Sequence, residues 1–253
     1  DKPKAQEPDV KDLSVYKGVW VFAEQKKGKV QSVAFELIGK AKELAAKLNT
    51  YVGAVLMGHD IELQAQELIC SGVDTVYLVD APALANYQDD SYTKVLLKLI
   101  EKYKPEIVLS GATIIGRSLI SRVAIKINTG LTADCTGLDV DTEKRLLLQT
   151  RPAFGGNIMA TIITPKHRPQ MATVRHKVFA MPVMDKKRTG KIVKEVFHVD
   201  DLKSRTRLVD VIEEVENLVN IAEADIIVSG GRGMQAPENF KLLEDLAEVL
   251  GAA

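Results

Sequence analysis

Residues 150–157 form one of three clusters in this sequence whose residue types could contact a ligand. They place Arg151 before Pro152, followed by Phe154 and a pair of glycines. A guanidinium keeps its positive charge at any working pH and matches planar or phosphorylated partners. Glycines let a backbone come close to such a partner. Composition alone, however, favours a wide hairpin with a surface arginine, so the residues by themselves predict a loop.

A second glycine-rich turn, at residues 230–233, holds Gly231 and Arg232 between an apolar segment and a predicted helix. Its glycines expose backbone N–H groups, and a guanidinium can bind phosphate in a bidentate manner. The alternative is a tight connection between a strand and a helix. Anion binding is favoured here, because an arginine has no structural reason to occupy such a turn.

Residues 110–118 follow a predicted strand and open a helix, a position where open α/β sheets bind ligands and where a helix favours an anion. No lysine follows Gly116, so this is not a Walker motif. Close packing of the strand, the turn and the helix explains the two glycines equally well.

The rest of the sequence excludes several functions. The four histidines lack metal-ligand spacing, and no self-contained catalytic centre is visible. The two isolated cysteines are typical of buried thiols in a reducing cytoplasm, so we expect a cytoplasmic protein without a disulfide or an iron–sulfur site. The 34 basic and 34 acidic residues balance, which argues against nucleic-acid binding. The apolar runs are far shorter than the ~20 residues that cross a membrane.

Strand and helix patterns alternate in the first half of the chain. Four continuous apolar runs are separated by segments with the periodicity of amphipathic helices, which predicts a parallel, doubly wound α/β sheet. The four runs are residues 19–23, 51–56, 75–79 and 107–110.

After Gly130 the pattern changes to shorter, alternating segments. Residues 138–150, 158–163 and 171–174 predict antiparallel strands added to the edge of the parallel sheet. Residues 225–229 predict one more strand, followed by a helix from about Pro237 to Leu250.

These patterns divide the chain into four parts. Residues 1–12 are expected to form a linker or arm, and residues 13–205 an N-terminal α/β domain. Residues 206–224 are expected to be a second linker. Residues 225–253 are expected to begin a second α/β domain that is truncated here.

The motifs taken together resemble the alpha subunit of electron-transfer flavoproteins. The resemblance extends from about Leu13 to Ala253, and the combination is specific although each motif alone is not. The matching segments are residues 21–25, 111–113 with 116–117, 130–135, 150–157, 169–175 and 229–233 with 238–241.

This resemblance implies an adenine-nucleotide-hydrolase-like N-terminal domain that pairs with a beta subunit, followed by a domain that binds FAD. The main FAD signature of the family, a Ser-Arg followed by Val-Asp-x-Gly, would begin a few residues after Ala253. Gly231 and Arg232 are the cofactor-binding residues that the resemblance implies in the second domain.

Residues 131–135 and 150–157 are similar to the anaerobic, electron-bifurcating branch of the family, in which the beta subunit carries a second FAD at the interface. The resemblance implies that Arg151 approaches N5 of this flavin and that Thr132 and Phe154 also contact cofactor. The implied function is electron relay among NADH, ferredoxin and a flavin-containing acyl-CoA or hydroxyacid dehydrogenase.

Two alternatives remain open at this point. The first is a simple electron carrier that feeds a quinone oxidoreductase. The second is a non-redox α/β module that binds AMP or ATP, with residues 111–118 as its phosphate loop.

Overall fold

The computed structural model describes residues 12–206, 208–210, 221 and 224–253. It divides into two compact units, Asp1–Arg207 and Leu208–Ala253. The predicted linkers lie largely outside the described residues, so their boundaries stay predictions.

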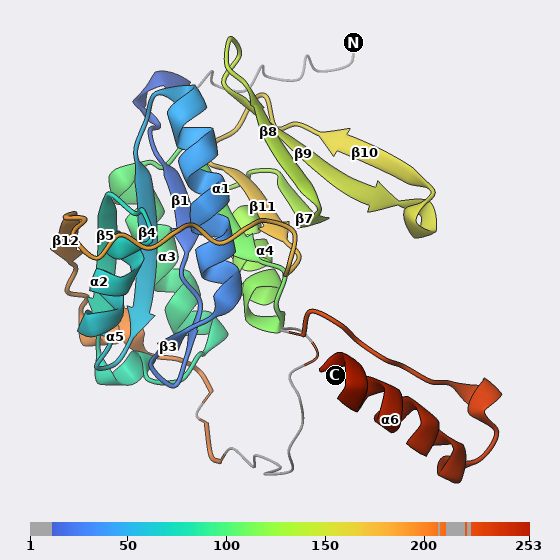
Figure 1. Cartoon of the computed structure of the whole chain (residues 1–253). Helices are drawn as coiled ribbons and strands as arrows, with labels where there is room; N and C mark the ends of the chain where they lie inside the picture. The colour runs from blue at the N-terminus through green and yellow to red at the C-terminus, as the bar shows by residue number, and fades with distance from the viewer. Residues whose placement is uncertain (1–11, 207, 211–220, 222–223) are drawn as a thin grey trace, which may run out of the picture. The chain divides into compact units, whose positions relative to one another are not determined.

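Seven parallel strands form the centre of the first unit (Figure 1). Every pairing in this sheet is parallel, so the carboxyl ends of all seven strands lie along one edge. This confirms the parallel α/β sheet that the sequence predicts. In spatial order the strands are β12 (Lys191–Lys194), β5 (Thr75–Asp80), β4 (Val52–Gly58), β1 (Val19–Phe22), β6 (Ile107–Gly111), β11 (Gln170–Val174) and β7 (Leu131–Cys135).

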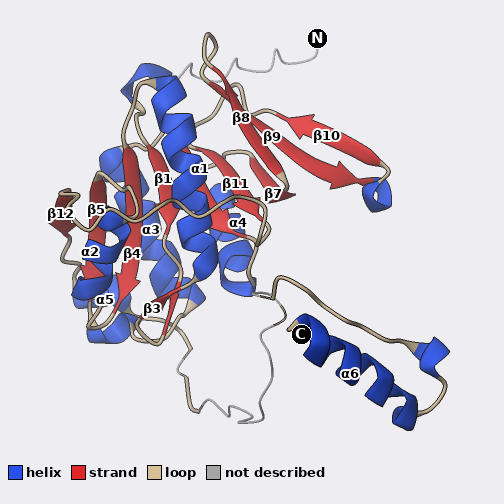
Figure 2. Cartoon of the chain, in the orientation of Figure 1, coloured by secondary structure: helices blue, strands red, loops and turns tan. Residues whose placement is uncertain are grey.

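Helices cover both faces of this sheet (Figure 2). Helices α1 (Ser32–Leu48) and α2 (Glu62–Cys70) pack on one face, and α3 (Asp89–Tyr103) and α4 (Ile114–Lys126) on the other. Strand β1 is continuously apolar in sequence because both of its faces are buried. Val19 and Val21 join the core on the α1 side, while Trp20 and Phe22 join the core on the α3 side, and all four side chains are buried.

Short elements complete the first unit: η1 (Leu13–Val15), β2 (Gln25–Lys26), β3 (Lys29–Val30), η2 (Pro82–Leu84) and α5 (Val199–Leu202). The predicted end of α3 is confirmed. Lys104 adopts a left-handed conformation with a φ of 49° directly before Pro105, as expected at a helix end. Within the described ranges, none of the helices combines the length and the apolar character needed to cross a bilayer.

A separate antiparallel sheet interrupts the path from β7 to β11. It consists of β8 (Gly137–Asp141), β9 (Leu146–Ala153) and β10 (Ile158–Ile162), with β9 in the centre. Leu138, Val140 and Leu147 pack into the core on the α1 side. Figure 1 shows the β9–β10 hairpin projecting from the body of the first unit, and we call this projection the β-arm.

The prediction that residues 171–174 run antiparallel at the sheet edge is wrong. Strand β11 is parallel, and it lies between β6 and β7 with all five residues buried. A short apolar run carries no information about strand direction. Its direction follows from the crossover that a parallel pair requires, and here residues 137–162 provide that crossover as an antiparallel sheet.

The second unit contains η4 (Arg232–Met234), η5 (Pro237–Phe240) and α6 (Lys241–Leu250), which agrees with the predicted helix. The strand predicted at residues 225–229 is wrong. This segment forms two backbone hydrogen bonds with Ala253, from Val228 N–H and to the Ile226 carbonyl. The described residues provide no neighbouring strand, and a parallel strand forms only in a ladder.

Candidate functional site

Arg151 lies near the end of β9, beside the carboxyl edge of the parallel sheet. Strand β9 is tied to this edge by a 2.9 Å hydrogen bond from Thr136 N–H to the Thr150 carbonyl. Burial raises the pKa of the nearby Cys135 thiol to about 11, and the positive charge of Arg151 acts in the opposite direction. The guanidinium is therefore within electrostatic reach of the end of β7.

Arg151 is half-buried, and most of its donors are not engaged. Among the residues that the structure describes, its guanidinium makes one long hydrogen bond, 3.5 Å from Nε to the Pro152 carbonyl. A bond of this length contributes little. A cation held on a regular strand with unused N–H donors can bind an electron-rich or anionic group.

The turn that follows Arg151 presents an aromatic ring and an open backbone. Phe154, Gly155 and Gly156 have φ values of 49°, 71° and 96°, and Phe154 is 82% exposed. Three successive left-handed residues are rare, above all where one is aromatic. Among the described residues, no atom lies within 4 Å of a Cβ built on either glycine. An exposed ring beside an open backbone could contact a planar ligand, and a cofactor role for Phe154 stays a prediction.

Thr132 differs from the other predicted cofactor-binding residues. It lies on β7 opposite Ala172 and is only 3% exposed. Its role as a cofactor contact stays a prediction, and in the first unit taken alone the side chain is covered.

An ion pair between α4 and β7 shapes the same edge of the sheet. Arg117 donates from Nε and Nη2 to the two carboxylate oxygens of Asp134, at 2.9 and 3.1 Å. Asp134 has a φ of 60°, and its N–H donates to the Thr173 hydroxyl at 3.0 Å. The sequence motifs include both charged residues, but only the structure reveals that they pair.

In the second unit, Gly231 precedes the short helix that begins at Arg232, and Arg232 is exposed. No atom of the described residues lies within 4 Å of a Cβ built on Gly231, whereas one built on Gly230 would lie 2.4 Å from Leu243. The turn thus combines close packing on α6 with an open backbone and a cation. These features fit the phosphate or ring of a dinucleotide, which leaves Gly231 and Arg232 as predicted ligands.

Residues 111–118, the phosphate loop of the AMP or ATP alternative, contact a carboxylate from another part of the chain. Glu24 follows β1, is 7% exposed and accepts a 2.5 Å hydrogen bond from the Thr113 hydroxyl. Thr113 in turn accepts from Gly116 N–H at the start of α4. A Cβ on Gly116 would lie 2.1 Å from the Gly111 carbonyl oxygen, so this turn is already closely packed. A phosphate here would meet a like charge, which argues against the AMP or ATP module.

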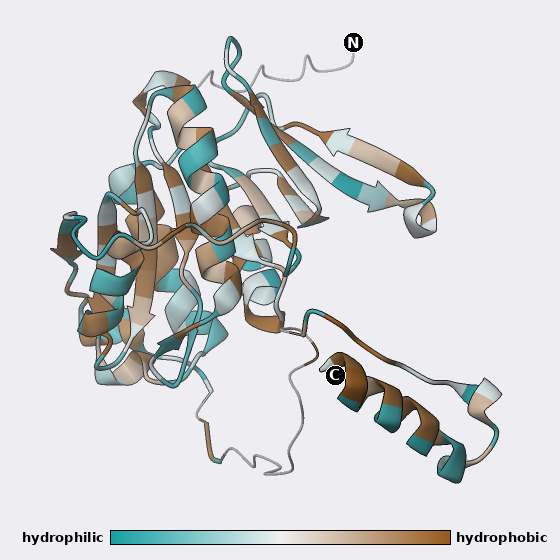
Figure 3. Cartoon of the chain, viewed as in Figure 1, coloured by the Kyte–Doolittle hydropathy of each residue, from teal (hydrophilic) through white to brown (hydrophobic). Residues whose placement is uncertain are grey.

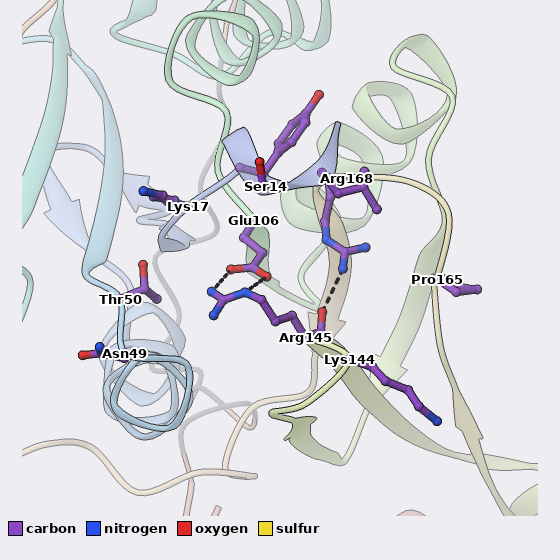
Figure 4. A pocket seen from close by; sticks show the side chains of 11 residues that line it. Ser14, Lys17, Asn49, Thr50, Glu106, Lys144, Arg145, Pro165 and Arg168 are labelled. Carbon is purple, nitrogen blue, oxygen red and sulfur yellow. Dashed lines mark hydrogen bonds and ion pairs between the residues drawn. The ribbon is translucent and has the colours of Figure 1, made fainter. Parts of the chain in front are cut away.

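A cavity of about 530 Å³ lies at the opposite, amino-terminal edge of the strands (Figure 4). Two of its charged groups, Arg145 and Glu106, are paired with each other. Arg145 binds the buried Glu106 carboxylate through two hydrogen bonds of 2.9 and 2.5 Å, and Arg168 donates to the Arg145 carbonyl at 2.8 Å. Sequence reasoning missed this cluster, which fixes the residue directly before β9.

Comparison with known proteins identifies the family. The model of the electron transfer flavoprotein domain matches residues 19–200, and that of the electron transfer flavoprotein FAD-binding domain matches residues 220–253.

Curated relatives agree. The electron transfer flavoprotein subunit alpha of Thermoanaerobacterium thermosaccharolyticum is 51% identical over 239 residues, which is 94% of this chain and 72% of that protein. The corresponding subunit of Clostridium acetobutylicum is 49% identical over 238 residues, covering 93% and 71%. The lactate dehydrogenase (NAD(+),ferredoxin) subunit LctC of Acetobacterium woodii is 43% identical over 241 residues, covering 95% and 57%.

The chain therefore belongs to the family of electron transfer flavoprotein alpha subunits. It is an electron carrier whose cofactor is FAD, and it contains part of the FAD-binding domain.

The buried Glu24 makes stability depend on pH. Burial raises its pKa above the usual 4.5, with the hydrogen bond from Thr113 opposing the shift. The folded state then binds this proton more tightly than the unfolded state, so stability falls as pH rises through the raised pKa. We expect Glu24→Gln to be more stable than the parent at neutral pH, and this gain to shrink as pH falls towards 4.5. Urea unfolding at several pH values measures it.

The exposed Glu62 provides the matched control, because Glu62→Gln is expected to change stability by less than about 0.5 kcal/mol. A stability gain in Glu24→Gln that stays the same across the pH range would contradict the buried-carboxylate account.

Proposed function

We propose that this chain is the alpha subunit of a bifurcating electron transfer flavoprotein. It pairs with a beta subunit and relays electrons between NADH, ferredoxin and a flavin-containing acyl-CoA or hydroxyacid dehydrogenase. The observation that carries the proposal is the half-buried Arg151, whose guanidinium stands at the carboxyl edge of the sheet with unused donors. Arg151 and Phe154 are the proposed contacts to an FAD at the subunit interface, and Thr132 borders the same edge.

Bound FAD supplies the electron-transfer chemistry, and the protein adjusts how readily the cofactor holds negative charge. Arg151 is cationic at every working pH. At about 4 Å and an effective dielectric constant near 20, its attraction for one negative charge is at most about 4 kcal/mol. For a one-electron couple this corresponds to about 170 mV before desolvation is subtracted. A shift of that size is enough to give two flavins in one complex different reduction potentials.

The comparisons support this proposal at one further point. The Acetobacterium woodii relative is named as a subunit of a lactate dehydrogenase that uses NAD(+) and ferredoxin. These are two of the partners that the proposal requires, together with a hydroxyacid dehydrogenase. No comparable observation favours the carrier that feeds a quinone oxidoreductase.

The β-arm is the proposed contact for the beta subunit. Four apolar side chains of this hairpin are between 39% and 56% exposed, and Phe154 at its turn is 82% exposed. Apolar residues lie on both faces of the edge strand β10, where Figure 3 shows the hydrophobic colouring. An exposed apolar edge strand is usually covered in a stable protein. The four side chains are Ile158, Met159, Ile162 and Ile163.

The number of cofactors separates the candidate functions. In the alpha–beta complex isolated with its cofactors, we expect two FAD per heterodimer, measured by flavin absorbance and nucleotide extraction. One FAD together with one AMP would support the simple electron carrier instead. A complex without flavin would rule out both redox functions.

Replacement of the cation tests the proposed role of Arg151. In the alpha–beta complex, Arg151→Ala is expected to lower the reduction potential of the interface flavin by up to about 170 mV, because the negative charge of the reduced cofactor loses its partner. Arg151→Lys should lower the reduction potential by less than Arg151→Ala does. Redox titration followed by absorbance measures the change.

Arg122→Ala, which removes an exposed arginine from α4, is the control and should leave the potential unchanged. If Arg151→Ala behaves like this control, Arg151 has no role at the flavin.

A charge on the β-arm is expected to weaken assembly. Met159→Asp places a carboxylate on the 56% exposed position of β10 and should reduce affinity for the beta subunit at least tenfold, while the isolated subunit stays folded. Calorimetric titration measures the affinity. Leu63→Asp, at an 84% exposed position of α2, is the matched control. Equal affinities for the two variants would place the interface elsewhere.

A further inference from the structure

Gln149, at the centre of β9, is a buried amide without a partner. It is 0% exposed, and in the part of the chain that the structure describes neither its oxygen nor its nitrogen has a hydrogen-bond partner. Leaving such a group unpaired costs about 1–3 kcal/mol. A buried polar group without a partner therefore calls for an explanation, and a functional role is one.

Gln170 shows how a structural glutamine behaves in the same protein. It is also 0% exposed, but both ends of its amide are bonded. Its oxygen accepts from Leu147 N–H at 2.8 Å, and its nitrogen donates to the Arg145 carbonyl at 3.1 Å. Burial alone thus does not account for the unpaired state of Gln149.

Gln149 and Arg151 are neighbours on one face of β9. Side chains two residues apart on a strand point to the same side, about 6.6 Å apart along the backbone. Both side chains are long enough to meet over that distance. The backbone N–H of Thr136 donates to the Thr150 carbonyl. The buried hydroxyl oxygen of Thr136, Oγ1, also has no hydrogen-bond partner among the described residues. In this described part of the chain, unpaired acceptors thus lie on the strand that carries Arg151, two residues from it, and on the residue bonded to Thr150, while most guanidinium donors of Arg151 are unused.

We propose that Gln149 is a positioning residue for Arg151. In the chain alone this amide is unpaired within the described residues; in the alpha–beta complex its oxygen accepts a guanidinium N–H of Arg151 and thereby fixes the direction in which the cation faces the interface flavin. This inference rests on the proposed function, because the proposed function supplies the interface flavin that Arg151 contacts. It also explains a buried glutamine at a place where an apolar side chain would be at least as stable.

The test is Gln149→Leu in the alpha–beta complex with FAD bound. Leucine is similar in volume and removes the unpaired amide, so the free energy of unfolding should stay the same or rise. The reduction potential of the interface flavin should nevertheless shift in the same direction as in Arg151→Ala, by a smaller amount. A residue with a purely structural role would not change the potential of a stable variant.

Two further variants make the result unambiguous. Gln170→Leu should lower stability, because it leaves partners unpaired, but should not change the potential. The double variant Gln149→Leu/Arg151→Ala should have the potential of Arg151→Ala alone, because Gln149 acts through the arginine. Gln149→Met replaces the leucine variant if that one does not fold.

Two outcomes overturn this inference while leaving the proposed function intact. One is an unchanged potential in Gln149→Leu when Arg151→Ala shifts it, and the other is additive shifts in the double variant. An unchanged potential in Arg151→Ala itself removes the proposed role of the arginine, and with it any need for a positioning residue.

Discussion

The attachment of β9 to the parallel sheet is the constraint on which the proposed site depends. Parallel strands need a crossover, and between β7 and β11 this crossover is an antiparallel sheet instead of a helix. Strand β9 is held at both ends. Arg145, directly before it, is clamped by Glu106 and Arg168, and Thr150 near its other end is bonded to Thr136 at the carboxyl edge. A single cation, Arg151, is thereby fixed at the end of a rigid strand.

Electrostatics explains why the position of one arginine matters in a protein of zero net charge. Without an overall field, the local arrangement of charges decides what binds. At the carboxyl ends of β1 and β6, where α/β sheets usually accept a phosphate, Glu24 places a negative charge and Thr113 satisfies it. At the end of β9 the charge is positive and an open glycine turn follows it in the sequence. The two regions therefore favour different partners.

The sequence predicted the fold where its signal was local. Continuous apolar runs such as 19–23 indicated strands buried on both faces, and the left-handed end of α3 followed from Pro105. Errors arose where long-range contacts decide. The direction of β11 depends on a crossover of more than thirty residues, and the segment at 225–229 lacked a neighbouring strand. The family resemblance singled out Arg151, but the pairing of Glu24 with Thr113 joins residues 89 positions apart and was invisible in the sequence.

The most direct measurement of the central claim is the structure of the alpha–beta complex with its FAD bound. The account predicts that the guanidinium of Arg151 lies within hydrogen-bond distance of the isoalloxazine ring at the interface, with the β-arm against the beta subunit. A structure in which this side chain turns away from every cofactor would contradict the account.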